Sequence, residues 1–266
     1  MDKDTVISLL TGEGLNAQSR FGQNFLCDDG VINKIIEISD IKPGCSVLEI
    51  GPGLGALSEK ILKTGSSYKA VEIDRGLFDL LQRTYGDHFI LSDYLKLAKE
   101  DYNPQGYDCV LSNIPYYIMT PIMKKLLIDC EKADRMTFMV EEAAIDRICA
   151  SKNSKQYGPL AVLCAVFGEV KKEFTVPSSA FYPMPHTTSA VISLKRREGS
   201  VISEVFAEFV EAAFSMRRKT FLNAVRSFSK SRNIDMSAIL DELGIDKNVR
   251  AESLDPSIFI SIYDLF

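Results

Sequence analysis

Short apolar runs alternate with amphipathic stretches from residue 45 to about residue 142. Five runs have the pattern of buried strands, at 45–51, 68–74, 88–93, 107–113 and 135–142. Between several of them, apolar residues recur at helical spacing, at 57–64, 76–85 and 121–130. Continuous apolar strands that alternate with helices are typical of a parallel sheet covered on both faces. We therefore predict an α/β fold with a Rossmann-like sheet.

The pattern changes twice after this region. Two further apolar segments, 169–177 and 189–197, have no helix between them, which predicts an antiparallel pair at one edge of the sheet. Beyond residue 198, apolar residues return at helical spacing: Val205, Phe206, Phe209, Val210, Ala213 and Phe214. We predict an α/β domain over 1–198 and a small helical domain over 199–266.

Composition adds the class of protein. The chain has 266 residues, of which 46% are hydrophobic and 25% charged, as in ordinary globular proteins. Its apolar runs fall short of the roughly 18 residues of a membrane span. The first residues, "MDKDTVISLL", carry acids where a signal peptide has a basic segment. We expect a cytoplasmic monomer without a membrane partner.

Cysteine and histidine usage disfavours several kinds of site. The six Cys are scattered without a C-x-x-C pair, and the two His, His88 and His186, stand apart from them. A metal site or a disulfide framework is therefore not expected. The scarcity of His also disfavours a hydrolase that depends on a Ser–His or Cys–His pair.

The net charge of -5 disfavours a nucleic-acid partner, but the charge is unevenly distributed. The segment 195–232 carries nine basic residues and four acids: Lys195, Arg196, Arg197, Arg217, Arg218, Lys219, Arg226, Lys230 and Arg232 against Glu198, Glu204, Glu208 and Glu211. A local excess decides where phosphate can dock, so Arg217, Arg218 and Lys219 are candidate RNA-binding residues. A solvated helix face is the alternative interpretation.

The segment "VLEIGPGLGAL", residues 47–57, combines a strand, a glycine-rich turn and the start of a helix. Such glycines allow positive φ and let a ligand approach the backbone. Glu72 ends the next strand, where a carboxylate can accept hydrogen bonds from a ribose. This pattern predicts a nucleotide-type site. NAD(P) fits it almost as well as other nucleotides, and a structural turn remains an alternative.

Polar residues also end the third and fourth predicted strands, at Asp93 and Asn113. Ligands of open α/β sheets sit beyond the carboxyl ends of the strands. We therefore expect Gly51, Glu72, Asp93 and Asn113 to converge on one cleft.

The segment "SNIPYYIMTP" follows the fourth strand and predicts an amino-group site. Pro115 restricts Ile114 to an extended conformation and ends the strand. The Asn113 side-chain oxygen and the Ile114 carbonyl can then accept both N–H bonds of an adenine amino group, while Tyr116 stacks on the ring. Two acceptors favour a pyramidal nitrogen whose lone pair can attack, and no strong base is required. The alternative is a capped strand end with core tyrosines.

"NIPYY" after "EIGPGLGAL" resembles the adenine-N6 methyltransferases that use S-adenosylmethionine. Five further segments extend the resemblance over nearly the whole chain: "RFGQNFLCD", "NSKQYGPLAVL", "SAFYPMPHTTSAVISL", "AFSMRRKTFLNAV" and "VRAESL". Together they are similar to the KsgA/RsmA family of ribosomal RNA adenine dimethyltransferases. The resemblance implies a Rossmann-like methyltransferase domain, a helical C-terminal domain, and dimethylation of two adjacent adenosines in a hairpin loop near the 3′ end of small-subunit (16S) rRNA, a step of ribosome biogenesis.

The resemblance also implies roles for individual residues. The cofactor-binding residues would be Asn24, Leu26, Gly51, Gly53, Glu72, Ile73, Asp93, Tyr94 and Asn113. The residues at the reacting amino group would be Asn113, Ile114, Pro115 and Tyr116, with Phe181 covering the flipped base opposite Tyr116.

Two departures from the family pattern keep alternatives open. Glu141-Glu142-Ala143 stands where Gln-Lys-Glu is common, which questions RNA contacts there. Ile114, where Leu is usual, is typical of the Erm-type methyltransferases of large-subunit rRNA. The alternatives are therefore an Erm-type enzyme, an NAD-dependent oxidoreductase, and a ribosome-assembly or transcription factor that uses the fold as a binding module.

Overall fold

The computed structural model describes residues 1–18, 21–102 and 106–266. The chain forms two compact units. The sheet unit comprises Met1–Glu142 and Lys171–Arg196, and the helical unit comprises Ala143–Val170 and Arg197–Phe266. The helical unit thus contains the segment 199–266, predicted as a helical domain, and also 143–170, which the sequence pattern had placed with the sheet.

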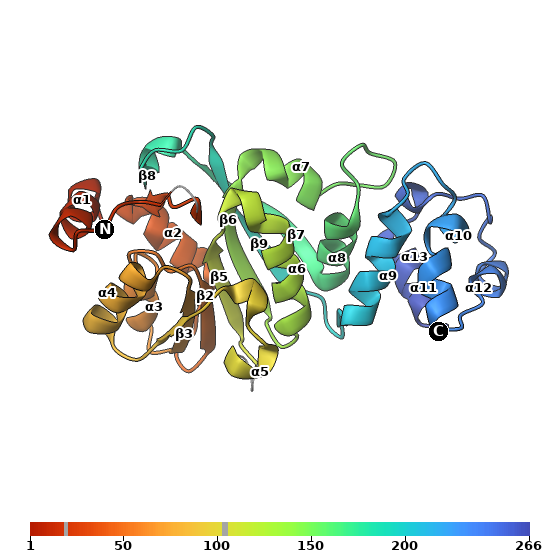
Figure 1. Cartoon of the computed structure of the whole chain (residues 1–266), viewed down its shortest axis with the longest axis horizontal. Helices are drawn as coiled ribbons and strands as arrows, with labels where there is room; N and C mark the ends of the chain where they lie inside the picture. The colour runs from red at the N-terminus through yellow and green to blue at the C-terminus, as the bar shows by residue number, and fades with distance from the viewer. Residues whose placement is uncertain (19–20, 103–105) are drawn as a thin grey trace. The chain divides into compact units, whose positions relative to one another are not determined.

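A seven-stranded sheet contains all five strands that the apolar runs predict (Figure 1). Its order is β4-β3-β2-β5-β6-β9-β7. The strands are β2 (Ser46–Ile50), β3 (Ser67–Glu72), β4 (Phe89–Leu91), β5 (Cys109–Asn113), β6 (Arg135–Glu141), β7 (Gly168–Val176) and β9 (Ser189–Arg196). The first five pair in parallel, and β9 pairs antiparallel to β6. This confirms the predicted α/β fold and places the two segments without an intervening helix together at one edge.

The strand register brings the predicted strand-end residues to the same edge of the sheet. Ile50, directly before Gly51, pairs with Val71 on one side and with Ser112 on the other. Glu72 and Asn113 are the next residues of those neighbouring strands. The ends of β2, β3 and β5 therefore open toward one region.

The remaining elements of the sheet unit are mostly helices. They are α1 (Lys3–Gly12), α2 (Asp29–Ser39), α3 (Ser58–Leu62), α4 (Arg75–Tyr85), α5 (Lys99–Tyr102) and α6 (Met119–Asp129), with the 3-10 helices η2 (Tyr94–Lys96), η3 (Tyr116–Ile118) and η5 (Ser178–Ala180). Two short strands, β1 (Phe25–Leu26) and β8 (Phe181–Tyr182), form a separate antiparallel pair. Side chains such as Asp28 and Asp74 cap helices α2 and α4, which explains where these helices begin.

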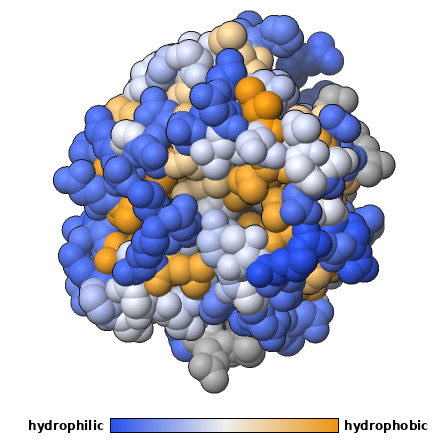
Figure 2. Space-filling model, turned by 90° about the vertical axis from the view of Figure 1, so that its left-hand side faces the viewer, coloured by the Kyte–Doolittle hydropathy of each residue, from blue (hydrophilic) through white to orange (hydrophobic). Residues whose placement is uncertain are grey.

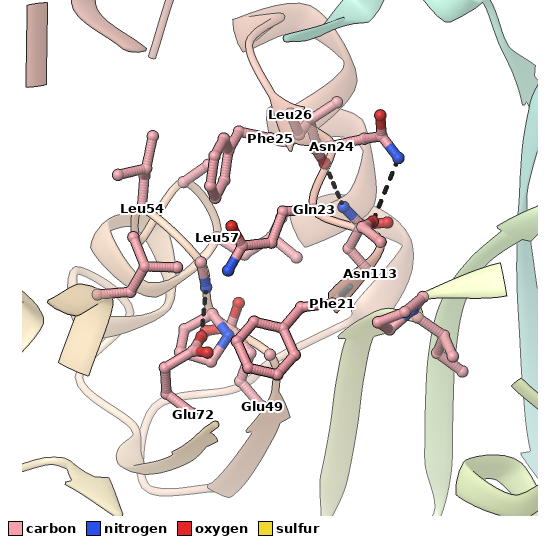
Figure 3. A pocket seen from close by; sticks show the side chains of 18 of the residues that line it. Phe21, Gln23, Asn24, Phe25, Leu26, Glu49, Leu54, Leu57, Glu72 and Asn113 are labelled. Atoms are coloured by element: carbon pink, nitrogen blue, oxygen red, sulfur yellow. Dashed lines mark hydrogen bonds between the residues drawn. The ribbon is translucent and has the colours of Figure 1, made fainter. Parts of the chain in front are cut away.

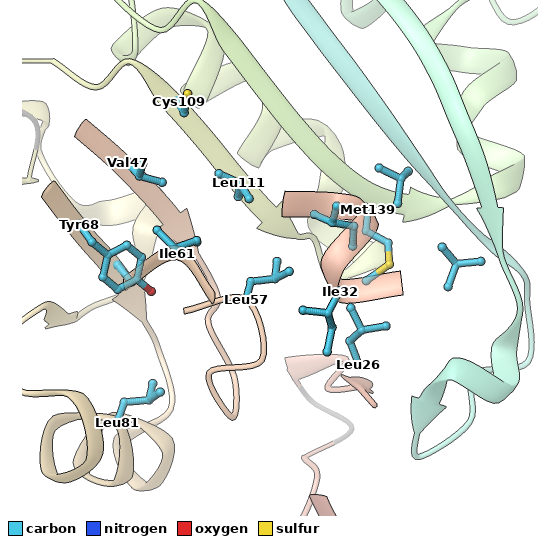
Figure 4. Close-up of a cluster of buried hydrophobic side chains, with 14 of the residues drawn as sticks. Leu26, Ile32, Val47, Leu57, Ile61, Tyr68, Leu81, Cys109, Leu111 and Met139 are labelled. Carbon is cyan, nitrogen blue, oxygen red and sulfur yellow. The ribbon is translucent and has the colours of Figure 1, made fainter. Parts of the chain in front are cut away.

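A hydrophobic cluster joins one face of the sheet to three helices (Figure 4). Ile32 of α2, Ile61 of α3 and Leu81 of α4 lie in the same cluster as Val47 of β2 and Leu111 of β5. These five side chains are completely buried. Full burial of one such aliphatic side chain contributes about 1.5–3 kcal/mol, so this cluster holds the strand ends in place.

The helical unit is built around aromatic rings. Its helices are α7 (Ile145–Ile148), α8 (Pro159–Phe167), α9 (Glu204–Phe214), α10 (Phe221–Ala224), α11 (Arg226–Ser231), α12 (Met236–Glu242), η6 (Ala251–Ser253) and α13 (Pro256–Tyr263); η4 (Glu142–Ala144) begins in the sheet unit. The Phe209 ring lies 5.9 Å from that of Phe221 and 6.1 Å from that of Phe259. Aromatic packing of this kind explains why the apolar spacing after residue 198 forms helices. Among the described residues, none of the helices has the length and apolarity needed to cross a membrane.

Candidate active site

A cavity opens at the carboxyl ends of β2, β3 and β5, and all of its lining residues belong to the sheet unit. Figure 3 shows Glu72, Asn113 and Asn24 around it, with Phe21 and Gln23 between them. Ten residues predicted from the sequence line this cavity: Asn24, Leu26, Gly51, Gly53, Glu72, Ile73, Asn113, Ile114, Pro115 and Tyr116. The expected convergence of Gly51, Glu72 and Asn113 is therefore present.

The glycine-rich turn forms one wall of the cavity. Gly51 and Gly53 have φ of 70° and 61°, values that side chains other than glycine's rarely allow. A Cβ on Gly53 would lie 3.2 Å from the Phe25 ring, whereas a Cβ on Gly51 would meet only open space. The backbone of the turn is thus exposed to a ligand at Gly51 and packed against the protein at Gly53.

Glu72 places a buried carboxylate at the end of β3. The residue is 3% exposed, and its two oxygens accept hydrogen bonds from the backbone N–H groups of Gly53, at 3.1 Å, and Asp74, at 2.9 Å (Figure 3). Burial raises the pKa of Glu72 to about 7, partly offset by these two donors. A carboxylate has about four acceptor directions, so Glu72 retains capacity for the hydroxyls of a ribose.

Asp74 ties the N-terminal segment to the same wall, a contact that the sequence did not reveal. One oxygen caps α4 by accepting from the Gly76 N–H at 2.9 Å. The other accepts from the side-chain amides of Gln18 at 2.7 Å and Gln23 at 3.0 Å. Only the capping role has a sequence signal, an Asp directly before a helical pattern.

Asn113 has a fixed orientation at the end of β5. Its Nδ2 donates to the backbone carbonyl of Asn24 at 3.2 Å, and Asn24 in turn donates its Nδ2 to the Gly22 carbonyl at 3.2 Å (Figure 3). Because the donor end of the Asn113 amide is held by the protein, its Oδ1 is the end that can accept from a ligand.

The next three residues turn the chain away from the strand. The Ile114 N–H donates to the Met139 carbonyl at 3.1 Å, and Pro115 (φ -59°, ψ 125°) leads into η3. The Tyr116 hydroxyl is hydrogen-bonded to Oγ of Ser189, a fully buried residue of β9. Burial raises the pKa of Tyr116, so its hydroxyl stays protonated. Ser189 therefore holds the Tyr116 ring at the cavity; it gave no signal in the sequence.

A second buried carboxylate, that of Glu49, also lines the cavity and was not predicted. It accepts hydrogen bonds from the hydroxyls of Ser58, at 2.7 Å, and Tyr68. Burial raises its pKa to about 7, opposed by these two donors.

Three predicted site residues lie elsewhere in the sheet unit. Asp93 caps η2 by accepting from the Leu95 N–H at 3.1 Å, and Tyr94 is buried with its hydroxyl 3.0 Å from that of Tyr102. Phe181 is 2% exposed, pairs with Leu26 across β1 and β8, and belongs to the hydrophobic cluster. None of the three lines the cavity, and their roles stay predictions.

The proposed RNA-binding residues follow α9 in the helical unit and differ in their contacts. Arg217 donates to the Lys155 carbonyl at 3.0 Å and to the Glu252 carboxylate at 3.4 Å. Arg218 and Lys219 are exposed. In the sheet unit, Glu142, one of the acids that depart from the family pattern, pairs with Lys172 at 2.6 Å.

The parallel sheet, the glycine turn with its buried acid, and the Asn-Ile-Pro-Tyr turn define an α/β methyltransferase that uses S-adenosylmethionine and acts on an amino group. The model of the ribosomal RNA adenine dimethylase family matches residues 14–266. The chain belongs to this family.

Curated relatives cover nearly all of the chain. It is 34% identical to ribosomal RNA small subunit methyltransferase A of Natranaerobius thermophilus, over 98% of this chain and 95% of that protein. It is 36% identical to the protein of the same name from Listeria monocytogenes, over 93% of this chain and 90% of that protein.

Two solved structures share the fold. A dimethyladenosine transferase from Plasmodium falciparum is similar with a TM-score of 0.73 and 22% identity, over 91% of this chain and 97% of that one. The 23S rRNA methyltransferase ErmE has a TM-score of 0.61 and 22% identity, over 91% of this chain and 98% of that one.

Proposed function

We propose that this protein transfers methyl groups from S-adenosylmethionine to N6 of two adjacent adenosines in the 3′-terminal hairpin loop of small-subunit rRNA. The product is N6,N6-dimethyladenosine, made as a step of ribosome biogenesis by a cytoplasmic monomer. Family membership and the names of the curated relatives support the reaction and the choice of subunit. The observation that carries the chemistry is the orientation of Asn113, whose amide nitrogen is bound to Asn24 so that Oδ1 can accept from a base.

The cavity fits the cofactor in two respects. The open space above Gly51 leaves room for a ligand against the backbone of the turn, and the Glu72 carboxylate is positioned to accept from ribose hydroxyls. When bound there, S-adenosylmethionine supplies an electrophilic methyl group. Asn24, Leu26, Gly53 and Ile73 would border it, since they line the same cavity.

The chain itself prepares the adenine amino group. Asn113 Oδ1 and the Ile114 carbonyl would accept its two N–H bonds, which favours a pyramidal nitrogen with an available lone pair. Tyr116, held through its hydroxyl by Ser189, would stack on the base. Positioning of this kind can lower a barrier by about 7–11 kcal/mol, so a strong base is not required.

The test is transfer of tritiated methyl groups from S-adenosylmethionine to purified, unmethylated small and large ribosomal subunits, with mass spectrometry of nuclease digests. We expect dimethyladenosine at two neighbouring small-subunit positions. Asn113→Ala should lower the rate by about 100-fold or more, as loss of one preorganised polar contact does in other enzymes. Asn248→Ala, at an exposed asparagine of the helical unit, is the matched control and should be fully active.

The same experiment separates the alternatives. Methylation confined to large-subunit RNA would favour an Erm-type enzyme, which the fold alone does not distinguish because ErmE shares it. Absence of methylation on either subunit would favour an assembly factor. The oxidoreductase interpretation is not supported, because the chain belongs to a family of rRNA adenine dimethylases.

A further inference from the structure

Tyr117 is a large aromatic residue at the surface beside the cavity. It is 61% exposed, although its neighbour Tyr116 is half-buried and held by Ser189. Both belong to η3, and successive residues of a 3-10 helix point about 120° apart. One tyrosine therefore belongs to the cavity and the next faces outward from the same turn.

The Tyr117 ring is supported by the rim of the cavity. A Cβ on Gly22 would lie 3.2 Å from Tyr117 Cε1 and 3.5 Å from Pro115 Cβ, so the ring packs closely against the backbone at Gly22. Gly22 has a φ of 60°, which fits a glycine at this close approach. Gly22, Pro115 and the neighbouring Phe21 all line the cavity. The ring is thus placed in advance, which reduces the conformational entropy that a ligand would have to overcome.

We propose that Tyr117 is a stacking platform for the nucleobase next to the target adenosine. The inference rests on the proposed function, because it needs a single-stranded RNA loop at this cavity. A base that enters the cavity leaves its neighbour without a stacking partner, and enzymes that extrude a base also contact the flanking nucleotides. Unstacked loop bases bind aromatic side chains, and an exposed ring at the rim offers such a face.

Three variants test this assignment with single-turnover methyl transfer to unmethylated small ribosomal subunits. Tyr117→Ala and Tyr117→Leu should weaken the apparent affinity for the subunit roughly 5- to 100-fold, the range for loss of one base–aromatic stack. Tyr117→Phe, which retains the ring, should behave as wild type. Val201→Ala, at an apolar residue that is 63% exposed in the helical unit, is the control and should have no effect.

The thermal midpoint and the affinity for S-adenosylmethionine should be the same in all variants, since the Tyr117 side chain is mostly exposed. Wild-type affinity for the subunit in Tyr117→Ala would overturn the inference, as would a normal Tyr117→Leu or a defective Tyr117→Phe. An inactive wild-type enzyme would instead contradict the proposed function. The two failures are therefore distinguishable.

Discussion

At the scale of single residues, two buried carboxylates at one cavity have different partners. Glu72 accepts from the backbone N–H groups of Gly53 and Asp74, and Glu49 accepts from the hydroxyls of Ser58 and Tyr68. Burial raises the pKa of both to about 7. The pairing of Glu49 within the protein leaves Glu72 as the carboxylate whose ionisation should govern cofactor binding.

We predict that the affinity for S-adenosylmethionine rises with pH through about 7. A ribose hydroxyl donates best to an ionised carboxylate, so affinity should fall about tenfold for each pH unit below the pKa of Glu72 in the free protein. Because this pKa is raised above the usual 4.5, the stability that Glu72 contributes is fully present below 4.5 and is lost as pH rises through about 7.

Calorimetry at several pH values measures this dependence. Glu72→Gln should bind more weakly at pH 8 and lose the dependence, whereas Glu49→Gln should retain it. A dependence that survives in Glu72→Gln and vanishes in Glu49→Gln would assign the titration to the wrong residue.

At the scale of elements, the turn after β2 combines a strained backbone with close packing. Gly53 has a φ of 61° and approaches the Phe25 ring of β1. Gly65, in the loop before β3, has a φ of 77° with open space where a side chain would be. The two glycines therefore share a conformation but differ in their surroundings.

This difference predicts different effects of alanine. Gly53→Ala and Gly65→Ala should each cost about 1–2 kcal/mol of stability, because a side chain is strained in the left-handed region. Only Gly53→Ala should also weaken binding of S-adenosylmethionine, since Phe25 and the turn must move apart. Chemical denaturation and calorimetry check the two effects, and equal cofactor affinity in both variants would refute the role of the turn.

At the scale of the whole molecule, docking on RNA is assigned to the helical unit. Arg217 is hydrogen-bonded to Lys155 and Glu252 within this unit, so its replacement would disturb folding as well as docking. Arg218 and Lys219 are exposed and can be changed with less effect on the fold.

We predict that Arg218→Glu combined with Lys219→Glu weakens binding to small ribosomal subunits and makes its salt dependence shallower by up to about two phosphate contacts. Affinity for S-adenosylmethionine should not change. Lys42→Glu combined with Lys63→Glu, at exposed residues of the sheet unit outside the cavity lining, makes the same change in charge and is the control. Filter binding at several salt concentrations decides; identical slopes for wild type and the first variant would leave the basic segment a solvated surface.

Much of the sheet and part of the site could be predicted from local patterns. The apolar runs, the glycine turn and Pro115 act on neighbouring backbone, so the five parallel strands and the positions of Glu72 and Asn113 follow from the sequence. The resemblance added Asn24 and Leu26, which line the cavity, and Phe181, which does not. The short pair β1 and β8 was not predicted, because two-residue strands have no periodicity.

Only the tertiary structure decided which side chains hold the site together. Ser189 is 73 residues from Tyr116, and Gln18 is 56 residues from Asp74, so neither hydrogen bond has a local signal. The same holds for Arg217, whose bonds to Lys155 and Glu252 depend on how the helical unit packs. Backbone conformation is set mainly by adjacent residues, whereas the partner of a polar side chain depends on which distant segments the buried core brings within hydrogen-bonding distance.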